Sequence, residues 1–238
     1  EVYDGIGLPW IVPELREDRG EIAAAEAGTL PDLVTLDDIR GDLHVHTTAS
    51  DGRNSLREMA EAAQARGYGY LAITDHSASQ TQAGGLSADE LCAHADAVRA
   101  LDDELDGIRL LAGAEVDILE DGRLDYPDDV LDRLDLVVAS VHAKLDLDAD
   151  SQTGRLLRAM DNPRVGILGH PTGRLIGERA PCALDMEGLV DGAAERGCAL
   201  ELNANPARLD LRDIHCRMAA ERGVAIAIST DAHSTAGL

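Results

Sequence analysis

The stretch Asp42-Leu43-His44-Val45-His46 is followed five residues later by Asp51-Gly52. Side chains alternate between the two faces of a β-strand, so His44 and His46 would share one face while Val45 turns into the opposite layer. Two imidazoles side by side at a strand end make half of a metal site. A His-x-His pair also arises by chance in a chain with eight histidines, so the stretch alone is a weak signal.

The same ending recurs along the chain. Further apolar runs end, or nearly end, in an acid or a histidine at Thr74-Asp75-His76, Gly113-Ala114-Glu115, Ser140-Val141-His142, Gly169-His170-Pro171 and Thr230-Asp231-Ala232-His233. The pattern predicts seven strands, at Arg40–His46, Gly69–Thr74, Arg109–Glu115, Leu134–Ser140, Val165–Leu168, Ala199–Leu202 and Val224–Ser229.

Helical patterns separate these strands. Ser55 and Ser87 each open a capping box, and Leu91, Ala95, Val98 and Leu101 have the spacing of one helix face. The predicted helices cover Glu21–Ala27, a segment starting at Ser55, Ser87–Leu105, Asp128–Leu131, Ser151–Met160, Asp185–Arg196 and Leu211–Arg222.

Apolar strands that alternate with helices favour a parallel sheet covered on its outside. Seven such units favour a (β/α)7 barrel of the α/β class over an open sheet. The active sites of such barrels lie at the C-terminal ends of the strands, which is where the acids and histidines fall.

The composition narrows the function. The chain has 238 residues, no Phe, 45 acids, 21 bases and a formal charge of −24, and Lys144 is its single lysine. Such a surface is typical of a halophilic protein or of an acidic protein from a GC-rich genome, and it excludes recruitment of nucleic acid by bulk positive charge. We see no apolar run of membrane-spanning length and no signal peptide, and the scattered cysteines have the pattern of reduced thiols, so we expect a cytoplasmic protein.

Nine strand-end residues form the predicted site. They are His44, His46, Asp51, His76, Glu115, His142, His170, Asp231 and His233. Nine ligands exceed what one ion takes, so two or three divalent ions are expected. Mixed imidazole and carboxylate ligands favour Mn²⁺, Zn²⁺ or Fe²⁺ over Mg²⁺ or Ca²⁺. Such clusters are suited to phosphoester hydrolysis, with a metal-bound hydroxide as the nucleophile.

These motifs resemble the PHP (polymerase and histidinol phosphatase) superfamily over residues 39–238. The resemblance implies a distorted seven-stranded barrel and a cluster of three ions. One ion would be held by His44, His46, Glu115 and Asp231; Glu115 would bridge to a second held by His142 and His170; Asp51, His76 and His233 would hold the third.

Residues 1–38 carry three prolines and the single Trp, and they have the character of a linker. Residues 7–22, with the later runs 170–175 and 201–210, resemble the C-terminal part of bacterial and archaeal family X DNA polymerases. That resemblance implies a Mn²⁺-dependent 3′–5′ exonuclease, with 3′-phosphatase or abasic-site cleavage as further possibilities. It also implies that the polymerase core precedes residue 1 and that another helix follows Leu238, so we expect the C-terminal end to be truncated.

Several assignments stay open at this level. Arg174 and Arg208 follow strand ends and are either phosphate clamps or ordinary exposed arginines. Asn203 and Asn205 either orient substrate or cap a turn, and Asp117 is the rival to Glu115 as bridging acid. His94 and His215 are expected on the surface of helices. A small-molecule phosphatase and a structural domain of a polymerase are the alternatives to DNA end-processing.

Overall fold

The computed structural model describes residues 2–238, which form two compact units, residues 2–39 and Arg40–Leu238. The first unit contains α1 (Val2–Ile6) and α2 (Glu21–Ala27). The helix expected at 21–27 is therefore confirmed. In this unit the guanidinium of Arg16 lies over the rings of Tyr3 and Trp10, and Ile11 is buried.

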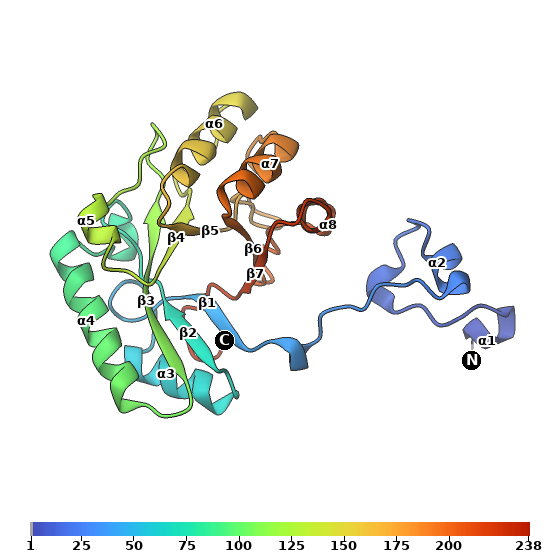
Figure 1. Cartoon of the computed structure of the whole chain (residues 1–238), viewed down its shortest axis with the longest axis horizontal. Helices are drawn as coiled ribbons and strands as arrows, with labels where there is room; N and C mark the ends of the chain where they lie inside the picture. The colour runs from blue at the N-terminus through green and yellow to red at the C-terminus, as the bar shows by residue number, and fades with distance from the viewer. Residues whose placement is uncertain (1) are drawn as a thin grey trace. The chain divides into compact units, whose positions relative to one another are not determined.

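The second unit is a seven-stranded barrel (Figure 1). All neighbouring strands are parallel and follow the order of the sequence from β1 to β7. The strands are β1 (Gly41–Val45), β2 (Tyr70–Ile73), β3 (Arg109–Asp117), β4 (Leu136–Ser140), β5 (Val165–Leu168), β6 (Ala199–Asn203) and β7 (Ile226–Ser229). Each lies within two residues of its predicted range, and the predicted fold class is confirmed.

The barrel closes almost completely between its first and last strands. Val45 pairs with Ala232 in a parallel bridge, and the amide of His46 donates to the carbonyl of Ala232 at 2.9 Å. This contact brings the loop after β7 beside the end of β1.

Helices surround the strands on the outside (Figure 1). They are α3 (Leu56–Ala65), α4 (Ala88–Glu104), α5 (Asp128–Leu131), α6 (Ala149–Met160), α7 (Met186–Arg196) and α8 (Asp213–Glu221). Both predicted capping boxes form, Ser55 with Glu58 and Ser87 with Glu90. The helix α6 begins two residues before its predicted start, because Asp148 caps it by accepting from the amide of Ser151.

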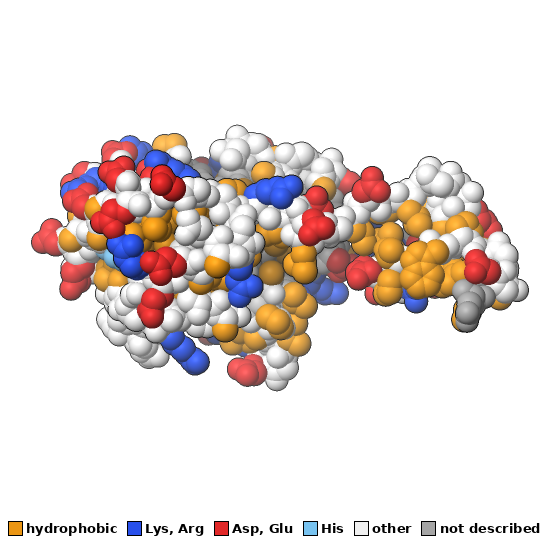
Figure 2. All heavy atoms as spheres, turned by 90° about the horizontal axis from the view of Figure 1, so that it is seen from below, with side chains coloured by type: hydrophobic (Ala, Val, Ile, Leu, Met, Phe, Trp, Pro, Cys, Tyr) orange, Lys and Arg blue, Asp and Glu red, His pale blue; other side chains and the backbone are white. Residues whose placement is uncertain are grey.

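The hydrophobic core is built almost entirely from Leu, Val, Ile, Ala and Met, as a chain without Phe requires. Acidic and basic side chains are interspersed on the face shown in Figure 2. Among residues 2–238, no helix combines the length and the apolar character that crossing a bilayer demands.

Candidate metal centre

The nine predicted site residues come together at the C-terminal ends of the strands. His44 and Glu115 lie in β1 and β3, and the others follow β1, β2, β4, β5 and β7. Their burial ranges from complete for His44, His46 and Glu115 to partial for Asp51 and His233.

Glu115 occupies the middle of the cluster. Its Oε1 lies 2.8 Å from Nε2 of His170 and 3.3 Å from Nε2 of His142. Its Oε2 lies 2.8 Å from Nδ1 of His76 and 3.5 Å from Nε2 of His44. Because each oxygen faces a different set of imidazoles, the carboxylate is placed as a bridge between two ions would be.

The loop after β7 supplies a second carboxylate. Asp231 has a φ of +55°, and its Oδ1 lies 3.1 Å from Nε2 of His46 and 3.7 Å from Nε2 of His44. A left-handed backbone is uncommon for residues other than glycine, so the surrounding structure must hold this residue in place.

The third group lies at the edge of the cluster. Asp51 Oδ1 is 3.3 Å from Nε2 of His233 and 3.6 Å from Nε2 of His76.

Four sets of donor atoms lie within 4.8 Å of one another and are close enough to surround an ion. They are His46 with Asp51, His76 and His233; His44 with His46 and Asp231; His44 with Glu115 and His170; and His76 with Glu115 and His142. Shared members between the sets indicate one continuous cluster.

The unsatisfied atoms of the cluster fit divalent cations. His44 Nε2 and Glu115 Oε2 are buried and have no hydrogen-bond partner, although they face each other at the centre. Buried polar atoms are normally paired, so a cation is a fitting partner for both. The mixture of imidazole nitrogens and carboxylate oxygens suits Mn²⁺, Zn²⁺ or Fe²⁺.

The groups of the cluster also shift one another's pKa values. Burial alone would raise the pKa of Glu115, but His142, His44 and His76 hold it well below its ordinary value. Burial would lower the pKa of His142, yet Glu115 and Asp117 raise it to about 10. Acids and imidazoles thus stabilise each other's charged forms, and a bound cation would displace the imidazole protons.

Two buried acids outside the predicted set orient the imidazoles. Glu201 Oε1 lies 2.7 Å from Nδ1 of His44, and Asp117 Oδ1 lies 2.6 Å from Nδ1 of His142. A proton on each Nδ1 leaves Nε2 directed at the cluster. Asp117 is therefore placed behind His142 and not as a rival bridge. Glu201 lies one residue before the end of the sixth predicted strand, so the pattern of an acid near the end of an apolar run also applies to it.

A glycine allows His170 to reach the cluster. A side chain at Gly169 would collide with Ser140 and Val138 of β4. The amide of His170 also donates to Glu201 Oε2 at 2.6 Å, so Glu201 fixes two members of the cluster.

The prediction of a surface position is wrong for His94. Its side chain is 13% exposed, and its Nε2 lies 2.9 Å from Oδ2 of the buried Asp75, which follows β2. Asp75 also accepts from Thr47 and Ser50 in the loop that carries Asp51. Packing of α4 against the barrel brings His94 to this carboxylate. His215, on α8, is half-buried and outside the cluster.

The two candidate arginines have different surroundings. Arg208 Nε lies 3.3 Å from Oδ2 of Asp231, and its buried Nη1 has no hydrogen-bond partner. Arg174 instead donates to the carbonyls of Arg208 and Leu209, so it braces the loop that carries Arg208. Asn203 lies 3.2 Å from Asp231 through its Nδ2.

Asn205 caps the turn after β6, because its side-chain oxygen accepts from the amide of Ala207.

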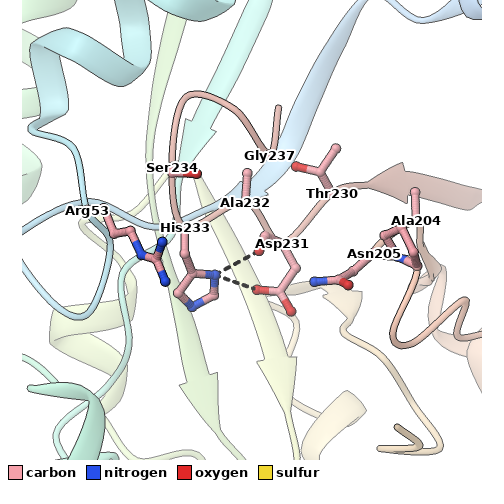
Figure 3. Close-up of a pocket in the computed structure, with 10 residues that line it drawn as sticks. Arg53, Ala204, Asn205, Thr230, Asp231, Ala232, His233, Ser234 and Gly237 are labelled. Carbon is pink, nitrogen blue, oxygen red and sulfur yellow. Dashed lines mark hydrogen bonds and ion pairs between the residues drawn. The ribbon is translucent and has the colours of Figure 1, made fainter. Parts of the chain in front are cut away.

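A cleft of about 410 Å³ opens beside Asp231 and His233. Figure 3 shows these residues between Arg53 on one side and Asn205 on the other.

Comparison with known proteins agrees with this architecture. The family model described as "PHP domain" matches residues 42–176. The chain is 48% identical over 234 residues to DNA polymerase/3′-5′ exonuclease PolX of Bacillus subtilis, covering 98% of this chain and 41% of that protein. The chain thus spans about two fifths of the length of this relative.

Two solved structures share the fold. The putative histidinol phosphatase of Listeria monocytogenes aligns with a TM-score of 0.68 at 14% identity, covering 83% of this chain and 97% of that one. Histidinol phosphate phosphatase of Lactococcus lactis, complexed with zinc, L-histidinol and phosphate, aligns with a TM-score of 0.57 at 17% identity, covering 82% and 87%. The family model covers more than half of the chain, and the barrel carries histidines and acids at its strand ends. The chain therefore belongs to the PHP domain family.

Proposed function

We propose that this chain is a divalent-metal-dependent phosphoesterase that removes nucleotides from the 3′ ends of DNA. The observation that carries the proposal is the convergence of nine imidazoles and carboxylates, with the buried Glu115 in their middle. The substrate class rests on the similarity to PolX, whose name includes a 3′-5′ exonuclease.

Two or three ions, Mn²⁺ or Zn²⁺ above all, would be held by the residues of the cluster. His44, His46 and Asp231 would hold the first ion, and Asp51, His76 and His233 the third. His142 and His170 would hold the second, since each lies close to Glu115 Oε1, and Glu115 would lie between the first two ions. When bound, such ions polarise phosphoryl oxygens and lower the pKa of water.

The protein's own groups would position the substrate. The guanidinium of Arg208 lies beside Asp231 with one buried nitrogen free, and it is suited to a phosphate oxygen. Arg174 holds the backbone of the loop behind it. Glu201 and Asp117 keep Nδ1 of their histidines protonated, so the Nε2 atoms stay directed inward.

The similarity to PolX also suggests the partners and the location of the chain. DNA 3′ ends would be the substrate, and a polymerase core in the same polypeptide would be the neighbour, with residues 1–38 as the linker. All four cysteines are free thiols, which agrees with a cytoplasmic enzyme.

Replacing Asp231 by Asn tests the chemistry. With Mn²⁺ present, we expect the rate of nucleotide release from a 3′-recessed oligonucleotide to fall by well over 100-fold. This exceeds the loss expected when a residue that only hydrogen-bonds to a metal ligand is replaced. The circular dichroism spectrum should be unchanged. Asp129→Asn, at an exposed position on α5, is the control. Unchanged hydrolysis by the Asp231 variant would rule out the proposed site.

A small-molecule phosphatase is the second candidate, because the Listeria monocytogenes and Lactococcus lactis proteins that share this fold are described as histidinol phosphatases. Rates on the oligonucleotide and on histidinol phosphate, measured in the same Mn²⁺ buffer, separate the two. Hydrolysis of neither substrate would favour a purely structural domain.

A further inference from the structure

The cleft beside the cluster has a polar rim and small apolar walls. The loops after β1, β6 and β7 form it, and Asp231 and His233 belong both to its lining and to the predicted cluster (Figure 3). Ala204, Pro206 and Ala232 supply apolar surface. A group bound in the cleft would therefore lie directly against the reacting centre.

Arg53 is the one Arg or Lys among the described residues that line this cleft. Its backbone is firmly held, because its amide donates to the carbonyl of His233 at 2.8 Å. The next residue, Asn54, accepts from the amide of Thr235 at 3.1 Å. These bonds tie the loop after β1 to the loop after β7 and fix the base of the Arg53 side chain beside His233.

The guanidinium of Arg53 is exposed, and no hydrogen bond or ion pair engages it within residues 2–238. Most other arginines of this acidic barrel pair with acids or donate to carbonyls, as Arg57, Arg133 and Arg174 do. A free cation at the mouth of the site is therefore available to an anionic ligand.

Arg208 and Arg53 stand in different relations to the cluster. Arg208 lies against Asp231, where a scissile phosphate would bind, whereas Arg53 lies at the outer rim beside His233. A simple phosphate monoester has one phosphate and cannot use both. A DNA strand carries a second phosphate one nucleoside away. Arg53 and Asp231 both line the cleft, and Arg208 lies against Asp231, so a nucleoside bound in the cleft would separate a phosphate at Arg208 from one at Arg53.

We propose that Arg53 binds the phosphate adjacent to the scissile one and so makes the site selective for DNA strands over substrates with a single phosphate. This inference rests on the proposed function. Together with Arg208 and the bound ions, Arg53 would supply positive charge where the strand binds, in a chain of net charge −24.

The experiment compares Arg53→Gln with the unmodified chain, in Mn²⁺, on a 12-nucleotide DNA strand and on a thymidine dinucleotide that has only the scissile phosphate. On the strand, we expect KM to rise about tenfold while kcat stays within about twofold, which is the signature of lost ground-state binding. On the dinucleotide, both constants should be unchanged. The slope of log KM for the strand against log salt should fall by about 0.7, the value for one phosphate contact.

Arg40→Gln is the matched control, because Arg40 is also exposed and unpaired within residues 2–238 but lies before β1, at the opposite end of the barrel. Arg53→Lys should restore part of the KM on the strand. An equal loss on both DNA substrates, or no loss on either, would overturn the role of Arg53. Failure of the unmodified chain to hydrolyse any DNA would instead overturn the proposed function, and this inference with it.

Discussion

Glu201 and Asp117 show how single residues outside the cluster control it. Each is a buried acid that accepts from Nδ1 of a histidine whose Nε2 faces Glu115. Without these acids, either imidazole could adopt the other tautomer or rotate away. Glu201 has the larger effect, since its second oxygen also accepts from the amide of His170.

Replacing Glu201 by Gln should weaken binding of Mn²⁺ by about 10- to 100-fold, because the amide is a poorer acceptor for the Nδ1 proton of His44. Titration calorimetry on metal-stripped protein measures this directly and does not depend on activity. Glu195→Gln, on the exposed surface of α7, provides the control. Equal affinities for the two variants would show that Glu201 has no part in orienting His44.

At the scale of elements, α6 secures the loops that follow two strands. Arg155 is 2% exposed and donates to the carbonyls of Ile118, Leu119 and Ala143, so one guanidinium satisfies backbone groups after β3 and after β4. Ala143 directly follows His142. The position of that histidine therefore depends on a helix that supplies no member of the cluster.

Arg155→Met would keep most of the side-chain volume and leave several buried carbonyls without a donor. Each such group costs about 1–3 kcal/mol, so we expect the free energy of unfolding to fall by roughly 3 kcal/mol in urea titrations. The neighbouring Arg158 donates to the carbonyl of Asp121 from an exposed position, and Arg158→Met should cost less than about 1 kcal/mol. If Arg155→Met lowered the free energy of unfolding by no more than Arg158→Met does, the anchoring role of Arg155 would be contradicted.

The strands could be predicted from the sequence, but the contacts that the helices make with them could not. The alternation of apolar runs and helices predicted all seven strands, and parallel strands end at one edge, so the nine strand-end residues could be expected together. Arg155 and His94 were not predictable in this way. Their partners lie on other elements, and the packing of α6 and α4 on the barrel determines which groups they meet.

Across the whole molecule, acids exceed bases by 45 to 21, so repulsion between like charges opposes folding wherever salt does not screen it. Any divalent cation will relieve part of this repulsion at the surface. A cation bound in the cluster differs, because it binds the folded state alone and meets several buried imidazoles.

Calcium and manganese separate these two effects. Both should raise the melting temperature of metal-stripped protein by screening, but Ca²⁺ prefers oxygen ligands and is poorly suited to the histidines of the cluster. At 100 times its dissociation constant, a specifically bound ion adds about 2.7 kcal/mol, which for a barrel of this size raises the melting temperature by about 5–10 °C. We therefore expect Mn²⁺ to raise the melting temperature by that amount more than Ca²⁺ does at equal concentration, as measured by scanning calorimetry.

Asp231→Asn should remove most of the difference while leaving the calcium effect intact, because screening depends on the surface acids and not on this buried carboxylate. Equal shifts for the two ions in the unmodified chain would mean that cations act on the surface alone.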